Sequence, residues 1–220
     1  MLSGVDGDSL DRTPGQTKAR SPKGGRTRAR LLTATIKVLG DVGYEAASVL
    51  EITKAAHVSN ATFYLYFKNK WEVMDAAVFQ VAHEITRQIH EEEQAIPDIV
   101  GKTVYGIRRF VATVLANPAW AKAMLAAYAA LPELRAYMGQ YTLRTLHQGI
   151  EEGAFHIQGS PLEVEALGAV VMLAVRLQLD GTAGPKATDE CIELIQRMLG
   201  VVGEPDRPRN RGQIGGKCKD

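Results

Sequence analysis

The sequence has little cysteine, no long apolar run and no recognisable signal peptide. Its two cysteines, Cys191 and Cys218, are too few for a disulfide framework or a cysteine-based metal cluster. The longest apolar run, 166–175, is about half the length of a membrane span. The first residues, MLSGVDGDSL, lack the basic start and apolar core of a secretory signal. We therefore expect a cytoplasmic protein with no membrane partner, no metal and no cofactor.

Alternation of apolar and polar residues, which marks a half-buried strand, is also missing over any useful length. Apolar residues instead recur at helical spacing, and they make up 45% of the 220 residues, which is enough for a substantial core. An all-α fold is therefore predicted. Residues 1–25 and 201–220 are rich in Gly, Pro and charge, and are predicted to be a flexible basic arm and a flexible tail.

Residues 26–72 contain the capping residues of a helix-turn-helix unit. A first amphipathic helix is expected to end at Gly43. Ser48 with Glu51 three residues later forms a capping box that starts a second helix, expected to end near residue 57. Ser59 can cap a third. Two short helices joined by about three residues define this motif.

Positive charge is concentrated at this end of the chain. Residues 18–75 hold 10 Lys or Arg and 5 Asp or Glu, although the net charge of the whole chain is only +1. Arg26, Arg28 and Arg30 are expected to open the first helix and Lys70 the fourth, where the helix dipole favours negative groups. These placements fit helix starts that bind phosphate, although an ordinary solvated surface also tolerates them.

The third helix, expected to extend to Lys68, separates into two faces. Phe63 and Phe67 can anchor one face in the core. The outward set is then Ala61, Tyr64, Leu65 and Lys68, with Asn60 and Thr62 at the flanks. Hydroxyls in this set suit phosphates, the amide suits an adenine edge, and the apolar side chains suit a thymine methyl. Simple packing of the tyrosine and the leucine is the alternative.

The stretch LLTATIKVLGDVGYEAASVLEITKAAHVSNATFYLYFKNKWEVM, residues 31–74, resembles the tetracycline-repressor (TetR) family of bacterial transcription regulators. The matching elements are Gly43-Tyr44, Ser48-Val49 before Ile52, Ala56, Val58-Ser59 at the turn, and Thr62-Phe63-Tyr64 with Phe67 and Lys70. The resemblance implies an all-helical dimer. Its paired N-terminal domains would bind a near-palindromic operator, and its C-terminal domain would hold a small-molecule pocket.

By this resemblance the phosphate contacts would be Thr62, Tyr64 and Lys70. The residues nearest the bases would be Asn60, Ala61 and Leu65. The complete set of predicted DNA-contacting residues is Arg26, Thr27, Arg28, Ser48, Asn60, Ala61, Thr62, Tyr64, Leu65, Lys68 and Lys70.

Three residues depart from the pattern of the family. His57 stands where the family usually has a turn glycine, and a histidine adopts a positive φ less easily than glycine does. Thr53 replaces a usual alanine, and Leu39 replaces a usual phenylalanine. These substitutions are expected to loosen local packing while leaving the contact residues in place.

The rest of the chain also reads as helices. Asn69 is expected to cap a fourth helix that runs to about residue 93. Proline and glycine residues then delimit helices at 98–116, 119–130, 133–152, 161–179 and 187–199. Helix 161–179 is apolar nearly all round and must be covered on several sides. A symmetric dimer seam formed with the last helix would explain this, and so would a central position in the core.

Aromatic and flexible side chains on the middle helices are candidate effector contacts. Tyrosines suit a mostly hydrophobic ligand with one or two oxygens, although each of them could equally be a core residue. Arg176 interrupts the most apolar helix and, if buried, needs either a ligand carboxylate or Glu165 of a second copy. The candidates are Tyr105, Trp120, Met124, Tyr128, Tyr137, Tyr141 and Arg176.

These features favour a ligand-responsive repressor that binds double-stranded DNA as a homodimer and is released by a small, mostly hydrophobic effector. The expected organisation is an arm (1–25), a helix-turn-helix domain (26–72), a helical effector-binding and dimerisation domain (73–200) and a tail (201–220). A helical protein-interaction adaptor that keeps the fold is the alternative. A helical enzyme is less favoured, because no nucleophile–base pairing, zinc-ligand spacing or phosphate-binding glycine loop is found.

Overall fold

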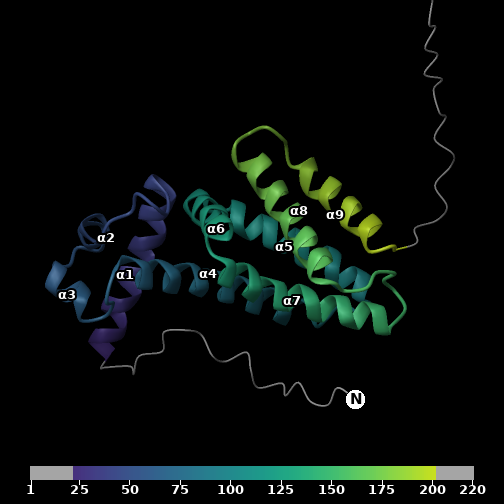
Figure 1. Ribbon diagram of the computed structural model, residues 1–220, viewed down its shortest axis with the longest axis horizontal. Helices are drawn as coiled ribbons and strands as arrows, with labels where there is room; N and C mark the ends of the chain where they lie inside the picture. The colour runs from purple at the N-terminus through teal and green to yellow at the C-terminus, as the bar shows by residue number, and fades with distance from the viewer. Residues whose placement is uncertain (1–21, 202–220) are drawn as a thin grey trace, which may run out of the picture.

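The computed structural model describes residues 22–201, and every regular element in this range is an α-helix (Figure 1). The helices are α1 (Pro22–Val42), α2 (Val49–Ala56), α3 (Asn60–Tyr64), α4 (Lys70–Glu93), α5 (Ile99–Leu115), α6 (Pro118–Ala130), α7 (Pro132–Glu151), α8 (Pro161–Leu179) and α9 (Lys186–Met198). The all-α prediction is confirmed. The predicted bounds of α2 and of α4 to α9 agree with these to within a residue or two, because caps and prolines delimit them. Helix α3 is shorter than predicted: it ends at Tyr64, and Leu65 to Lys68, predicted to continue it, lie beyond its end.

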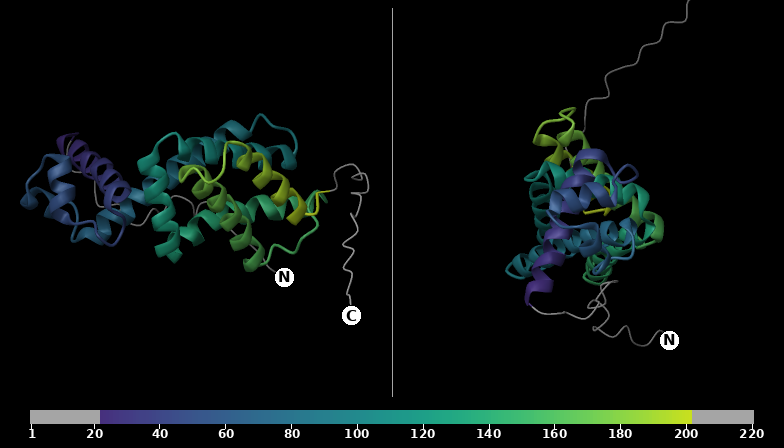
Figure 2. Two further views of the ribbon diagram at one scale, coloured as in Figure 1. Left: turned by 90° about the horizontal axis from the view of Figure 1, so that it is seen from above. Right: turned by 90° about the vertical axis from the view of Figure 1, so that its left-hand side faces the viewer.

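Helices α1, α2 and α3 lie at one end of an elongated molecule, and α5 to α9 form the body at the other end (Figures 1 and 2). Helix α4 runs from the first group into the second, so the domain boundary predicted at residues 72 and 73 falls within its first turn. One apolar core continues from α1–α3 along α4 into α5, α6 and α7. A smaller apolar cluster joins α5, α7, α8 and α9.

The predicted caps form as expected. The Ser48 side chain accepts a hydrogen bond from the backbone N–H of Glu51, and the Glu51 carboxylate accepts one from the N–H of Ser48. The Asn69 side chain caps α4 by accepting a hydrogen bond from the N–H of Glu72. His57 follows α2 with φ of +52°, so the turn takes the left-handed conformation that a glycine adopts more easily.

Helix α1 begins earlier than predicted. It starts at Pro22, whose missing N–H and fixed φ are compatible with the first helical position. Residues 22–25, predicted as part of the flexible arm, are therefore helical, and Arg26 lies beyond the first turn. The predicted conflict between the arginines and the dipole of α1 does not arise, since that effect fades after the first turn. Residues 1–21 and 202–220 lie outside the described part of the chain.

Helix α8 is apolar, as predicted, but it is not enclosed on all sides. Leu167 and Val175 are buried, whereas Leu162 is 79% exposed and Leu173 is 43% exposed. Within residues 22–201 no single helix has the length and apolar character needed to span a membrane. Helices α5 and α6 meet this test only as a pair that is bent by 114°.

Helices α1 and α6 pack closely because α1 has a glycine at the crossing point. A Cβ atom added at Gly40 would lie 2.7 Å from the Cα and 2.9 Å from the carbonyl oxygen of Ala119. These are backbone atoms, which cannot turn aside as a flexible side chain would. Gly40 therefore sets how near the N-terminal helices can approach the body of the molecule.

We expect Gly40→Ala to lower the free energy of unfolding by about 1–3 kcal/mol, because overpacking forces the two helices apart. Gly25→Ala is the matched control in the same helix, since a Cβ atom added at Gly25 would meet nothing within 4 Å. The control should raise the free energy of unfolding by about 0.5–1 kcal/mol through better helix propensity. Urea unfolding measures the free energy of unfolding of both variants. An increase for Gly40→Ala as large as that for the control would contradict the close approach of the two helices.

Candidate nucleic-acid interface and ligand pocket

Helix α3 is anchored by aromatic side chains on one face and open on the other. Phe63 and Phe67 are buried, with ring centroids 5.9 Å apart. Tyr64 is 58% exposed and Leu65 is 74% exposed. The predicted separation into an inner and an outer face is confirmed, and it continues past the end of α3, since Leu65 and Phe67 follow the helix. The exposed leucine leaves apolar surface available to a partner.

The other predicted contact residues near α3 share its open side. Asn60, Ala61 and Lys68 are exposed. Thr62 is half-buried, and its hydroxyl lies 2.9 Å from the hydroxyl of Ser59, the residue that caps the helix. The residues predicted nearest to DNA are therefore accessible and close together in sequence and space.

Lys70 has partners within the protein. Its ammonium donates hydrogen bonds to the carbonyl oxygens of Glu45 and Ala47, at 3.0 and 3.1 Å. The same ammonium lies 4.3 Å from the centroid of the Trp71 ring. Lys70 thus ties the start of α4 to the loop that precedes α2, and one of its three donors is left for another acceptor.

The basic side chains of α1 behave in two ways. Arg30 donates to the carbonyl oxygen of Ala56 at 2.6 Å, at the carboxyl end of α2, and Arg28 lies 5.3 Å from the centroid of the Phe67 ring. Arg26 is exposed and Thr27 is half-buried. Of the predicted contact residues in this region, Arg26 is the accessible cation, whereas Arg28 packs on an aromatic ring of the fold.

Thr53 joins the two helices of the motif. Its side chain is buried, and its hydroxyl lies 2.8 Å from Oδ1 of Asn60 and 3.1 Å from the carbonyl oxygen of Leu50. The sequence predicted looser packing at this position. The structure gives the threonine a hydrogen bond across the turn instead, and this contact fixes the side chain of an exposed residue of α3.

A cavity of about 140 Å³ lies in the body and is lined by residues of α4 to α9. Most of its wall is apolar and includes Ile89, Ile107, Phe110, Leu146 and Met172. Polar side chains at the wall include Tyr128, Tyr141, Thr142, Lys102, Arg135 and Glu165. Such a mixture of apolar walls and a few polar groups is typical of small-molecule sites.

Two of the seven predicted effector contacts, Tyr128 and Tyr141, line this cavity. The other five lie elsewhere. Tyr105 donates a hydrogen bond to Glu92 on the outside of the molecule, and Tyr137 packs on Phe79 and contacts His83. Met124 is in the core, and Trp120 is half-buried away from the cavity. Arg176 is exposed. The prediction used residue type, whereas the lining of α7 follows a helix face: Arg135, Met138, Gly139, Thr142, Thr145 and Leu146.

Tyr141 connects the cavity to α4. Its hydroxyl donates a hydrogen bond to the carboxylate of Glu93, a buried residue at the end of α4. Nδ1 of His90 lies 3.1 Å from the other oxygen of that carboxylate. Burial and the neighbouring carboxylate raise the pKa of Tyr141 above its usual value, so the hydroxyl stays protonated.

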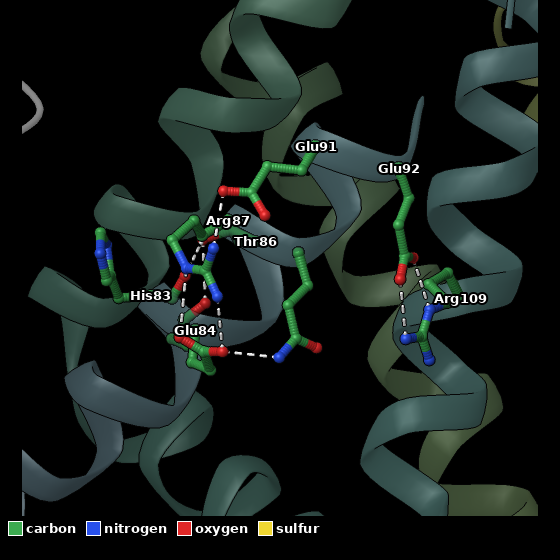
Figure 3. A network of polar contacts seen from close by, with 9 residues as sticks. His83, Glu84, Thr86, Arg87, Glu91, Glu92 and Arg109 are labelled. Carbon is green, nitrogen blue, oxygen red and sulfur yellow. Dashed lines mark hydrogen bonds and ion pairs between the residues drawn. The ribbon is translucent and has the colours of Figure 1, made fainter. Parts of the chain in front are cut away.

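The outer side of α4 carries a network of ion pairs (Figure 3). Arg87 lies between Glu84 and Glu91, at 2.8 and 2.6 Å. Glu92 faces Arg109 of α5 at 2.7 Å, and hydrogen bonds from Arg109 and Tyr105 lower the pKa of Glu92 to about 2. Helix α4 is therefore bonded to α5 on its outer side and to α7 on its inner side.

Two family models match the chain. Residues 31–77 match the bacterial regulatory proteins of the tetR family, and residues 102–207 match the tetracyclin repressor-like C-terminal domain. The chain belongs to the TetR family of transcriptional regulators. Members of this family bind DNA, dimerise and bind small molecules. A comparison with curated proteins gives no match.

Several solved structures have a fold similar to that of this chain over most of its length. The fatty acid degradation regulator FadR from Bacillus halodurans has a TM-score of 0.70 at 20% identity, over 87% of this chain and 100% of its own. RolR in complex with resorcinol has a TM-score of 0.63 at 21% identity, over 83% and 91%. A TetR family regulator from Marinobacter aquaeolei VT8 has a TM-score of 0.60 at 25% identity, over 80% and 95%.

The shifted pKa values of Cys191 and Glu163 in this TetR-family chain follow from burial and from helix capping. Burial raises the pKa of the Cys191 thiol to about 11, which disfavours the nucleophilic thiolate. The pKa of Glu163 is lowered by hydrogen bonds from the backbone and side chain of Ser160, as part of a helix cap. Within residues 22–201, no three His, Cys, Asp or Glu side chains are grouped so that they could hold a metal ion.

We expect Tyr141→Phe to lower the free energy of unfolding by about 1–3 kcal/mol, because the buried carboxylate of Glu93 loses a hydrogen-bond donor. Tyr105→Phe is the matched control, since its hydroxyl also donates to a glutamate but at an exposed site. The control should cost less than about 1 kcal/mol, because water can replace an exposed donor. Equal losses in the two variants, measured by thermal unfolding at one pH, would show that Glu93 does not depend on Tyr141.

Proposed function

We propose that this protein is a cytoplasmic, ligand-responsive transcriptional repressor that binds a near-palindromic operator as a dimer and is released by a small, mostly hydrophobic effector. The observation that carries this proposal is the open face of α3. Tyr64 and Leu65 stay exposed because Phe63 and Phe67 are buried behind them. An aromatic-anchored helix with exposed hydroxyl, amide, apolar and basic groups suits the major groove of DNA.

The chemistry of the exposed groups supports different roles at the groove. Lys68 and Arg26 can neutralise phosphates, and the hydroxyls of Thr62 and Tyr64 can donate to them. The Leu65 side chain is apolar and 74% exposed, so contact with a thymine methyl would remove it from water. Ser48 and Lys70 have capping and bracing roles already, and we assign them indirect parts in orienting the motif.

The exposed face of α8 supports a dimer. Leu162, Glu165, Leu173 and Arg176 recur at helical spacing, and all four are exposed. Leu194 on the adjacent helix α9 is 41% exposed. A second copy related by a two-fold axis would cover these leucines and bring Glu165 of one chain toward Arg176 of the other. Arg176 is exposed here and needs no ligand carboxylate.

Helix α4 supports the proposed coupling between effector and operator. Its first residue, Lys70, holds the loop before α2, while Thr86 and Ile89 line the cavity. A ligand that displaces α4 would change the spacing of the two DNA-binding ends in a dimer. If the ligand lowers the affinity for the operator by some factor, the operator must lower the affinity for the ligand by the same factor.

The proposal is tested by selecting bound sequences from a pool of random DNA duplexes with the full-length protein. A repressor of this kind should enrich a near-palindromic site, whereas an adaptor that only keeps the fold would enrich none. The salt dependence of binding to the enriched duplex then reports on the phosphate contacts.

We expect Lys68→Ala to reduce the slope of log affinity against log salt concentration by about one unit per protomer, because each lost phosphate contact removes one released counterion. Lys122→Ala, at an exposed lysine of α6, is the control and should leave the slope unchanged. Fluorescence anisotropy between roughly 50 and 200 mM salt measures both. An unaltered slope for Lys68→Ala would remove this lysine from the phosphate contacts.

The Thr53 hydrogen bond predicts a limit on what Asn60 can read. A bidentate contact with adenine needs both the oxygen and the NH2 of the Asn60 amide to face the base, and that oxygen accepts a hydrogen bond from the hydroxyl of Thr53. We expect Thr53→Ala to free the amide and to increase the preference for adenine at one position of each half-site. Thr53→Ser keeps the hydroxyl and should retain the wild-type profile. The duplex selection above measures the profile, and a uniform loss for all sequences would mean that the contact serves stability alone.

A further inference from the structure

The cavity extends along α7. Its lining residues on α7 extend from Arg135 to Leu146, which is about 16 Å along a helix. Its volume is only about 140 Å³. An engineered apolar cavity of about 150 Å³ in another protein holds one benzene molecule. The space in this chain therefore fits a slim apolar body of roughly six carbon atoms.

The two ends of the cavity differ in their free charge. At one end the guanidinium of Arg135 donates to the carbonyl oxygen of Tyr128 at 2.7 Å and lies 3.9 Å from the carboxylate of Glu165. This arginine is thus already paired. The Glu165 carboxylate would repel an anion that entered there.

Lys102 supplies the other charge. It lies one turn after Ile99, which clusters with Leu146 and Phe155 at the opposite end of the cavity wall. Lys102 is half-buried, and no hydrogen bond or ion pair joins its ammonium to any residue between 22 and 201. The nearby Asp98 carboxylate instead caps the N–H of Gly101 at 2.7 Å.

An unpaired ammonium at an apolar wall favours an anionic partner, because its partial burial costs free energy that a counter-charge offsets. A single ammonium matches a single negative charge. We propose that the cavity binds a small monocarboxylate, with its carboxylate at Lys102 and an apolar body of about six carbons, aliphatic or aromatic, directed toward Tyr128. This inference rests on the proposed effector role of the cavity and names the chemical class of the effector.

Isothermal titration of the full-length protein with four probes tests the class. Hexanoate and benzoate carry the charge on an aliphatic and an aromatic body, and 1-hexanol and benzyl alcohol are their neutral counterparts. At least one acid should bind about tenfold more tightly than its alcohol, because a hydrogen bond to a charged group is lost in the alcohol. The acid that binds more tightly shows whether the cavity prefers an aliphatic or an aromatic body. Equal affinity of each acid and its alcohol, or no binding of either acid, would overturn the inference.

Substitution of the lysine tests its role. Lys102→Met keeps an unbranched side chain without the charge and should abolish the preference for the acid, whereas Lys102→Arg should keep most of it. Lys122→Met is the matched control at an exposed lysine of α6 and should bind like the wild type. Unchanged thermal unfolding of Lys102→Met would show that the fold is intact. A retained acid preference in that variant would exclude Lys102 as the carboxylate partner.

The duplex selection separates this inference from the proposed function. If the protein enriches an operator but binds no acid, the proposed repressor role stands and the proposed class of effector is wrong. If the protein binds the acid through Lys102 but enriches no operator, the proposed ligand site stands and the proposed repressor role is wrong.

Discussion

The burial of α4 against both ends of the molecule is the constraint on which the other contacts depend. Near its start, Lys70 and Asp75 hold the loop before α2, the former through two carbonyls and the latter through the hydroxyl of Tyr44. Its middle is packed in the continuous core, and its last turns border the cavity. Because a 24-residue helix is about 36 Å long and stiff, it fixes the distance between the loop and the cavity.

The cations around the DNA-binding motif divide according to the partners that the fold offers them. Arg30 lies where the last carbonyls of α2 lack helical partners, and it donates to one of them. Lys70 does the same for the loop carbonyls of Glu45 and Ala47. Both side chains therefore stabilise the geometry of the motif. The exposed Lys68 and Arg26 make no ion pair with any residue between 22 and 201, so their charge is available to a partner. A basic segment is thus not uniformly a phosphate-binding surface.

Local patterns in the sequence predicted the helices, the capping box at Ser48 and the two faces of α3, because each depends on residues three or four positions apart. Contacts between distant residues were not predictable in this way. Lys70 meets carbonyls more than twenty positions earlier, and Thr53 meets Asn60 across a turn whose geometry depends on His57. Apart from Tyr128 and Tyr141, the residues that line the cavity were not predicted for the same reason, since the face of α7 that lines the cavity is defined by helices α5 and α8.

The Tyr141–Glu93 hydrogen bond gives the cavity a direct mechanical connection to α4. Tyr141 is at the cavity wall, so a ligand that moves its ring also moves the donor on which the buried carboxylate depends. Water cannot readily replace that donor at a buried site, so Glu93 and the end of α4 would have to follow the tyrosine. On the outer side, Glu92 and Arg109 join α4 to α5, and displacement would have to carry both helices or break this exposed pair. The exposed pair is the weaker of the two polar connections, because solvent screens it, so the hydrogen bond between Tyr141 and Glu93 is the firmer polar link of α4 to its neighbours.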